Sequence, residues 1–271
     1  MHILESSCGG IILINHVQFG QGKDVIFLHG WGGDTRSFLG CAKAISSNFR
    51  VTLVDFYGFG KTPAPDYPLV LQDYADGVVE IIRHYKMSRV ILVGHSFGGR
   101  VAIRIASKNG YLLDGIVLVD SAGIKPRRGI RYYGKILTHK ILTRLGISHR
   151  SGSEDYRKLS GVGKQTFKNI VNEDQTGELR KITLPVLLIW GDKDKDTPIY
   201  MAKRIYRRIP TSSLVIFRGE GHFAYLRRHR LFTEILRTFL SDGEYEVDYR
   251  RHNNVIGKRR VVKIPYLRAE K

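Results

Sequence analysis

The chain reads RVILVGHSFGGRVAIRIA over residues 89–106. An apolar, β-branched run stops at its first glycine and apolar residues then return at helical spacing, so a buried strand is predicted to pass directly into a helix. Ser96 lies at this junction, between Gly94 and Gly98. Two interpretations are open: Ser96 caps the helix, or it is a nucleophile.

The glycines favour the second interpretation. In a G-x-S-x-G turn the serine adopts a strained backbone, and only small neighbours let the strand and the helix approach closely enough. The arrangement exposes a hydroxyl at a helix N-terminus, where the helix dipole and free N–H groups favour negative charge.

The rest of the chain alternates apolar strands with amphipathic helices, which predicts an α/β fold with a mostly parallel sheet flanked by helices. The predicted strands are two short ones within 11–19, then 24–29, 50–55, 90–93, 115–120, 185–190 and 213–217. The predicted helices are 38–47, 69–85, 101–108, 197–208 and 224–241.

In such sheets the ligand site lies beyond the carboxyl ends of the strands. Chemically capable side chains do gather just after the predicted strands, namely His29, Asp55, Ser96, Asp120, Asp194 and His222. A serine hydroxyl needs a base to remove its proton, and the base needs an orienting carboxylate. We expect His222 to be the base and Asp194 the carboxylate. Asp120, Asp192 and Asp196 compete with Asp194 for that role.

A developing oxyanion requires two N–H donors. The backbone N–H of Phe97, directly after the nucleophile, is one expected donor. The backbone N–H of Trp31, in the glycine-rich turn after an earlier strand, is the other. His29, Gly30 and Gly32 are expected to support that turn, with His29 as a structural anchor.

Five motifs together resemble the α/β-hydrolase fold superfamily, and within it the capped serine esterase and C–C hydrolase branch. They are HGWGG at 29–33, DFYGFGKT at 55–62, GHSFGG at 94–99, WGDKD followed by Pro198, and GEGHF at 219–223. The resemblance covers about residues 10–241. Tyr57 departs from it, because relatives often carry proline there.

The resemblance implies a division of the chain. Residues 1–121 and 182–242 form the hydrolase core, and residues 122–181 form a small helical cap inserted after the sixth strand. Helical pieces are expected in the cap at 132–145, 153–159 and 163–171. Residues 243–271 form a basic extension that could be an edge strand at 260–265, an interaction arm or a disordered segment.

The resemblance also implies a chemistry of acyl transfer to water, without a cofactor or metal. A carboxylic-ester hydrolase acting on a small or acyl substrate is the leading expectation. A C–C bond hydrolase and a thioesterase or acyltransferase working on an acidic carrier share the same site residues. The HGWG turn also resembles the methyl-ester esterases that act on acyl carrier protein.

The formal net charge of +19 is large for 271 residues. An excess of this kind attracts acidic proteins, anionic lipid or nucleic acid. No specific nucleic-acid-binding motif accompanies it. An acidic partner or an anionic surface is expected at the cap and tail, and a non-catalytic basic binding module is the remote alternative. Eight basic residues and no acidic one occur in 125–150: Lys125, Arg127, Arg128, Arg131, Lys135, Lys140, Arg144 and Arg150.

The remaining expectations concern the compartment. Cys8 and Cys41 are the only cysteines, and their spacing does not suggest a metal site, so reduced thiols are expected. No signal peptide or apolar run of ~18–20 residues is visible, which predicts a cytoplasmic protein without a transmembrane segment.

Overall fold

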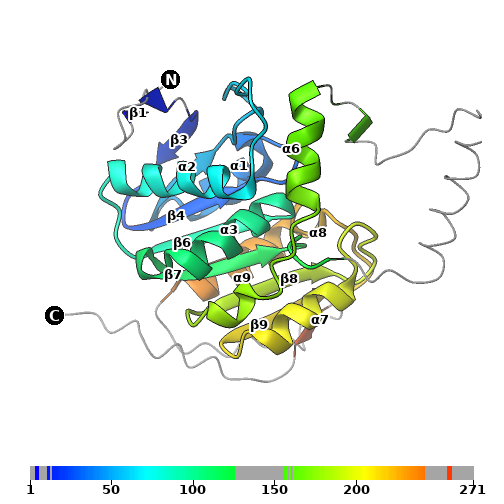
Figure 1. Ribbon diagram of the computed structural model, residues 1–271. Helices are drawn as coiled ribbons and strands as arrows, with labels where there is room; N and C mark the ends of the chain where they lie inside the picture. Colours follow the sequence, from blue (N-terminus) through cyan, green and yellow to red (C-terminus); the bar gives the residue numbers. More distant parts are fainter. Residues whose placement is uncertain are drawn as a thin grey trace, which may run out of the picture.

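An eight-stranded sheet forms the centre of the molecule, with helices on both of its faces (Figure 1). The computed structural model describes Leu4–Glu5, Ile11–Ile12 and residues 14–125, 156–157, 159, 161–241 and 255–257. The strands of the sheet are β3 (His16–Phe19), β4 (Lys23–Leu28), β5 (Phe49–Val54), β6 (Val90–His95), β7 (Leu113–Val119), β8 (Val186–Gly191), β9 (Ser212–Phe217) and β10 (Val255–Gly257). A separate two-stranded sheet pairs β1 (Leu4–Glu5) with β2 (Ile11–Ile12).

The strand order is β10-β9-β8-β7-β6-β4-β5-β3. The strands from β5 to β9 run parallel, and the edge strands β3 and β10 pair antiparallel with β5 and β9. This is the mostly parallel α/β-hydrolase sheet that the sequence predicts. The edge strand in the C-terminal extension lies at Val255–Gly257, whereas the predicted one at 260–265 falls outside the described residues.

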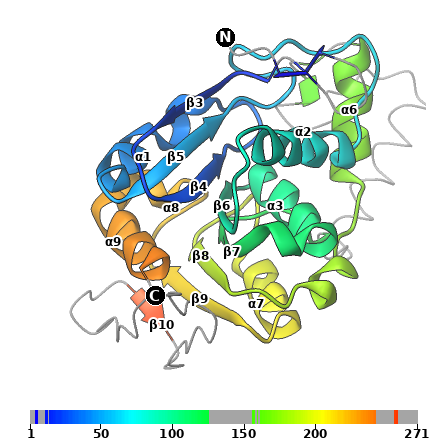
Figure 2. The same ribbon diagram turned by 90° about the vertical axis from the view of Figure 1, so that its left-hand side faces the viewer.

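Two apolar cores lie on opposite faces of the sheet. Strand β6 is buried throughout: Val90 and Leu92 contribute to one core, and Ile91 and Val93 to the other. Strands covered on both faces read as continuous apolar runs, which is why they could be recognised in the sequence. Figure 2 shows α2 (Leu71–His84), α3 (Phe97–Lys108) and α7 (Ile199–Arg208) on one face, and α1 (Leu39–Ile45), α8 (Ala224–Arg227) and α9 (His229–Leu240) on the other.

Two predicted helices differ from the observed ones. The single helix expected at 224–241 is two helices, α8 and α9, which join at Arg228 with φ −108° and ψ 40°. The side chain of Arg228 pairs with Glu220 at 2.6 Å. The helix expected at 38–47 begins earlier, as a 3₁₀ turn over Thr35–Phe38, because Asp34 accepts a hydrogen bond from the Arg36 N–H at 2.8 Å.

The described part of 122–181 includes helix α6 (Gly161–Val171) and the 3₁₀ helix η3 (Glu178–Lys181). Helix α6 confirms the predicted helix at 163–171. Its Thr166 hydroxyl accepts a hydrogen bond from the Leu69 N–H at 3.0 Å, and Asn169 donates to the Leu69 carbonyl at 3.0 Å. The predicted helix at 132–145 lies outside the described residues, and of 153–159 only 156, 157 and 159 are described.

Two buried arginines of α3 hold the chain that follows α6. Arg104 pairs with Glu173 and donates to Glu178 at 3.0 Å. Arg100 donates to the Glu173 carbonyl at 2.9 Å. Removing an arginine from such a buried cluster leaves carboxylates without their counter-charge, which is costly. The helix that begins after Ser96 therefore also anchors the end of the segment predicted as a cap.

Two further observations concern the cysteines and the length of the helices. Cys41 is a buried free thiol, and burial raises its pKa to about 11, so it is a poor nucleophile at neutral pH. Cys8 lies outside the described residues. Among the helices that the structure describes, none is long and apolar enough to cross a membrane.

Candidate active site

Ser96 occupies the turn between β6 and α3 with a backbone φ of +49°. A non-glycine residue in this region is strained, and such strain persists only where the surroundings enforce it. Main-chain hydrogen bonds provide part of that restraint. The Ser96 N–H donates to the Val119 carbonyl, and the Ser96 carbonyl accepts from the Ala122 N–H, both at 3.0 Å.

The glycines beside Ser96 provide the close approach that the turn needs. A Cβ atom on Gly94 would lie 2.5 Å from the Gly98 carbonyl oxygen. A Cβ atom on Gly98 would lie 2.1 Å from the carbonyl oxygen of Leu28, at the end of β4. Neither position accepts a side chain without movement of the backbone. The start of α3 is therefore pressed directly against the ends of two strands.

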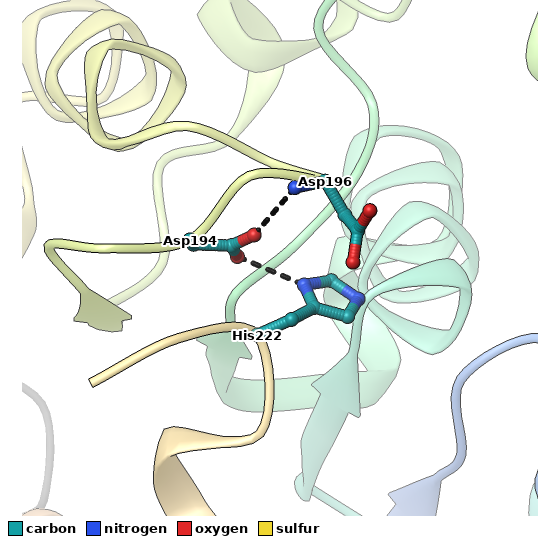
Figure 3. Close-up of side chains that lie close together, drawn as sticks. All are labelled: Asp194, Asp196 and His222. Carbon is teal, nitrogen blue, oxygen red and sulfur yellow. Dashed lines mark hydrogen bonds and ion pairs between the residues drawn. The ribbon is translucent and has the colours of Figure 1, made fainter.

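His222 and Asp194 form a hydrogen-bonded pair at the same end of the sheet (Figure 3). The Nδ1 atom of His222 lies 2.8 Å from Oδ2 of Asp194, and the Asp194 side chain has no exposed surface. An ionised carboxylate only accepts hydrogen bonds, so Nδ1 carries the hydrogen. The other ring nitrogen, Nε2, is then the one that can accept a proton.

Asp194 is held in its ionised form by hydrogen bonds to both oxygens. Oδ1 accepts from the backbone N–H groups of Asp196 at 2.8 Å and Thr197 at 3.0 Å. Oδ2 accepts from the Thr197 hydroxyl at 2.6 Å in addition to His222. Burial by itself raises the pKa of Asp194, but the hydrogen bonds from His222 and Thr197 outweigh burial and lower it.

Two of the three competing carboxylates, those of Asp192 and Asp120, accept hydrogen bonds from other backbone N–H groups. Asp192 accepts from the Gly219 N–H at 2.7 Å. Asp120 is completely buried and accepts from the Gly191 N–H at 2.8 Å through Oδ1, while its Oδ2 has no hydrogen-bond partner among the described residues. Burial and the neighbouring Asp194 carboxylate raise the pKa of Asp120 well above its usual range. Burial therefore disfavours the charged form of Asp120.

Asp196 lies on the exposed side of the same loop. Its carboxylate points toward the imidazole, as Figure 3 shows, and possible ligand atoms of Asp194, Asp196 and His222 lie within 4.8 Å of one another. Within the described residues this is the one group of histidine, cysteine and acidic side chains close enough to hold a metal ion. Two of its three members already bind each other through Nδ1 and Oδ2.

The glycine-rich turn after β4 presents the Trp31 amide at the same edge. The Gly33 N–H donates to the Gly30 carbonyl at 3.0 Å, and Gly32 has φ +77°, which fits a type II turn with Trp31 as its second residue. Phe97 is the first residue of α3, where helix N–H groups have no partner within the helix. Both amides named from the sequence therefore lie in conformations that leave N–H groups available.

His29 has both ring nitrogens engaged in main-chain hydrogen bonds. Nδ1 donates to the Gly30 carbonyl at 2.7 Å, and Nε2 accepts from the Phe56 N–H at 3.1 Å. Burial lowers the pKa of His29, which keeps the ring neutral. This arrangement suits a structural support of the turn.

Aromatic side chains cover the space above the turn. The Trp31 ring lies 4.9 Å from Phe59, 5.3 Å from Phe97 and 5.0 Å from Phe167 of α6, measured between ring centroids. Phe167 was not recognised from the sequence, because a single aromatic residue in a helix carries no positional signal. The edge-to-face contacts form an apolar wall beside the Trp31 amide.

The structure does not join all the named residues directly. Among the described residues no hydrogen bond connects the Ser96 hydroxyl to His222. The link between their loops is His95, which sequence reasoning passed over as a variable residue of G-x-S-x-G. Its ring centroid lies 4.8 Å from that of His222.

Comparison with known proteins gives consistent matches. The model of the Alpha/beta hydrolase family matches residues 25–234. The chain is 30% identical over 235 residues to a pimeloyl-[acyl-carrier protein] methyl ester esterase of Nitrosomonas europaea, covering 76% of this chain and 91% of that protein. It is 28% identical to the AB hydrolase superfamily protein YisY of Bacillus subtilis, covering 81% and 92%. An esterase of Exiguobacterium antarcticum has a similar structure, with a TM-score of 0.71, 23% identity and coverage of 88% and 98%.

Proposed function

The chain belongs to the alpha/beta hydrolase family, and on this premise we propose that it is a serine hydrolase that cleaves carboxylic esters. The observation that carries the proposal is the buried hydrogen bond between Asp194 and Nδ1 of His222, at the sheet edge where Ser96 has a strained, positive φ. An oriented base at the sheet edge that carries the candidate nucleophile supports this chemistry.

The proposed reaction has two stages. The Ser96 oxygen attacks the ester carbonyl while His222 Nε2 takes the hydroxyl proton, and the same proton then passes to the departing alcohol. Water next attacks the acyl group on Ser96, again with His222 as base, and releases the acid. Asp194 keeps the imidazole in the required tautomer and stabilises its charged form.

Charge that develops on the carbonyl oxygen needs donors fixed in advance. We propose the backbone N–H groups of Trp31 and Phe97 for this role, and removal of one such donor typically slows an acyl transfer by ~10²–10³. The side chain of Trp31, with Phe59 and Phe167, supports an apolar acyl group in the adjoining space. Helix α6, whose Phe167 lies beside Trp31, is proposed to form part of a cap over this space.

Hydrolysis of p-nitrophenyl esters of increasing acyl length tests the proposal. The wild-type protein is expected to release p-nitrophenol with a preference for acyl chains longer than acetyl. Ser96→Ala and His222→Ala are each expected to reduce kcat/KM by roughly 10⁴ or more while the thermal unfolding midpoint stays near that of wild type. Absence of turnover by folded wild-type protein across the series would contradict the proposal.

A second candidate substrate is an ester whose acyl group is carried on an acidic protein. It is favoured by the 30% identity to the pimeloyl-[acyl-carrier protein] methyl ester esterase and by a basic surface on α7 and η3. Within the described residues no acidic side chain forms an ion pair with the members of this surface. They are Arg180, Lys181, Lys203, Arg204, Arg207 and Arg208.

Salt dependence distinguishes the two substrates. The pair Lys203→Glu and Arg207→Glu is expected to lower kcat/KM for a carrier-bound methyl ester by about tenfold and to leave the free ester unaffected, because exposed charges steer encounter. Lys43→Glu, on α1 of the opposite face, is the matched control. Wild-type turnover of the carrier-bound ester should also fall as salt screens charges beyond ~10 Å at 0.1 M. Equal salt responses for both esters would exclude a carrier.

A further inference from the structure

His95 lies immediately before Ser96 and reaches the main chain of the proposed base. Its side chain is 2% exposed, and its Nε2 atom lies 2.8 Å from the carbonyl oxygen of His222, 127 residues away in the chain. Its ring also contacts Phe223 and Tyr225, with centroids at 5.3 Å and 4.9 Å. His95, at the end of β6, therefore packs against the segment that follows β9.

The hydrogen bond fixes the tautomer of His95. A carbonyl oxygen only accepts, so Nε2 must carry the hydrogen and donate it. Nδ1 is then unprotonated and faces Gly30, where a Cβ atom would come within 2.7 Å of it. Burial and the neighbouring His222 lower the pKa of His95 to about 3, so the ring stays neutral at neutral pH. His95 is a fixed donor and not a second base.

The loop that carries His222 is otherwise tied to the other side of the site. The Glu220 backbone carbonyl accepts from the Lys193 N–H at 2.8 Å, and the Gly219 N–H donates to the Asp192 carboxylate at 2.7 Å. These bonds attach it to the loop of the orienting carboxylate. A Cβ atom on Gly219 or Gly221 would meet no heavy atom within 4 Å, so no side chain packs on that side of the loop, whereas its Glu220 and Gly221 carbonyl oxygens lie close to Gly191.

His95 attaches the loop that carries His222 to the turn at residues 94–99, which carries Ser96 and is called the nucleophile turn below. Of the hydrogen bonds among the described residues, the one from His95 to His222 joins residues 94–99 to residues 218–223. Asp194 fixes the orientation of the imidazole through Nδ1, and His95 fixes the main chain from which that imidazole projects. Asp194, in the loop after β8, and His95, at the end of β6, thus both restrain His222.

We propose that His95 is a positioning residue, which sets the distance between the Ser96 hydroxyl and Nε2 of His222 by holding the His222 main chain against the nucleophile turn. The inference rests on the proposed function, because it assigns His95 a role in proton transfer from Ser96. It adds a residue that acts through His222 without touching the substrate.

Two substitutions of similar length separate the hydrogen bond from the packing. His95→Gln keeps an N–H donor at about the reach of Nε2, and His95→Met fills similar space without a donor. Steady-state kinetics on p-nitrophenyl butyrate and the rate of covalent labelling by a fluorophosphonate are measured for both. His95→Phe, which keeps an aromatic ring against Tyr225 and has no donor, replaces the methionine variant if that one fails to fold.

The donor-free variant is expected to lose about 10²-fold in kcat and in labelling rate with KM unchanged, since a misplacement near 1 Å has an effect of that size. The glutamine variant is expected to stay within about fivefold of wild type. Equal activity of the donor-free variant and wild type would overturn the proposal, as would equal loss in the glutamine and donor-free variants. Wild-type protein that neither turns over the ester nor takes the label would instead refute the proposed function itself.

Discussion

At Ser96 the backbone φ of +49° carries a cost of order 1–3 kcal/mol, which the surrounding contacts must sustain. The contacts are specific: the turn is bonded to Val119 and Ala122 and enclosed by Gly94 and Gly98. A serine that merely caps a helix does not need this conformation, because cap residues ordinarily have extended backbones. The strained turn is consistent with the proposed role of Ser96 as a nucleophile.

Asp194 and Asp120 allow a sharp test of the orienting acid. Asp194→Asn is expected to reduce kcat by roughly 10⁴, because the amide no longer selects the tautomer with hydrogen on Nδ1 of His222. Asp120→Asn is expected to stay within about tenfold of wild type, because burial disfavours the charged form of Asp120 and the amide oxygen can still accept from the Gly191 N–H. Ester kinetics on both variants provide the measurement. The reverse ranking would assign the acid to Asp120.

The sequence favoured Asp194 as the orienting carboxylate, but spacing alone did not exclude its neighbours. Three aspartates within five residues, Asp192, Asp194 and Asp196, all follow β8, and their spacing does not say which one turns inward. The choice depends on the turn formed when Asp196 and Thr197 donate their N–H groups to Asp194. His95 was missed for a related reason, because its partner is a main-chain carbonyl that leaves no residue signature.

At the scale of elements, the contact between α3 and the sheet determines the geometry of the turn. Gly98→Ala is expected to lower the free energy of unfolding by roughly 1–3 kcal/mol, because its Cβ would lie 2.1 Å from the Leu28 carbonyl oxygen. Gly177→Ala is the matched control, with φ −71° and open space at its Cβ, and is expected to be neutral or stabilising by ~0.4–1 kcal/mol. Urea unfolding measures both. Equal effects would mean that the close approach at Gly98 is unimportant.

The arginine cluster on α3 gives a second prediction about elements. Arg104→Met is expected to lower the free energy of unfolding by about 2–3 kcal/mol, below the ~3–5 kcal/mol typical of breaking a fully buried pair, because Glu173 remains 31% exposed. Arg36→Met, in a pair whose arginine is 83% exposed, is expected to leave the free energy of unfolding almost unchanged, because solvent screens such a pair. Thermal and urea unfolding compare the two. An effect of Arg104→Met as small as that of Arg36→Met would show that the cluster does not anchor the segment after α6.

The elements themselves were largely predictable. Strands β4 to β9 are covered on both faces, and this coverage makes them short apolar runs that read clearly. The break between α8 and α9 was not predictable, because the amphipathic pattern continues through Arg228. The ion pair from Arg228 to Glu220 is a tertiary contact, and local spacing contains no signal for it.

At the scale of the whole molecule, buried neutral histidines couple stability to pH. The pKa of His95 is lowered to about 3 in the folded protein, against 6.5 in the unfolded chain. Between these values the unfolded chain binds a proton that the folded protein does not. The free energy of unfolding therefore falls as pH drops through this window, by up to ~1.4 kcal/mol per pH unit for this group. His29 acts in the same direction, and Asp120 with its raised pKa acts in the opposite one.

The difference between wild type and His95→Gln isolates the contribution of His95. Urea unfolding at pH 7.5, 6.0 and 5.0 is expected to show the variant gaining stability relative to wild type as the pH falls. A difference that stays constant over this range would mean that His95 is not buried as a neutral ring. The comparison is free of the opposing effect of Asp120, which both proteins share.

The global charge was predictable and its arrangement was not. The net charge of +19 follows from composition, but the basic surface of α7 and η3 arises because residues 180–181 and 203–208 come together on one side of the fold. The sequence placed its expected anionic partner at residues 122–181 and 243–271. The described basic surface includes Arg207 and Arg208, which lie outside those ranges.

Covalent labelling with a fluorophosphonate probe, followed by mapping of the modified peptide, determines whether Ser96 is an activated nucleophile. The probe reacts with serines activated by a base, so wild-type protein should be modified once, at Ser96. Ser96→Ala should take no label, and His222→Ala should be labelled far more slowly. Folded wild-type protein that stays unlabelled, or a Ser96→Ala variant labelled as readily as wild type, would contradict the assignment of Ser96 as the nucleophile.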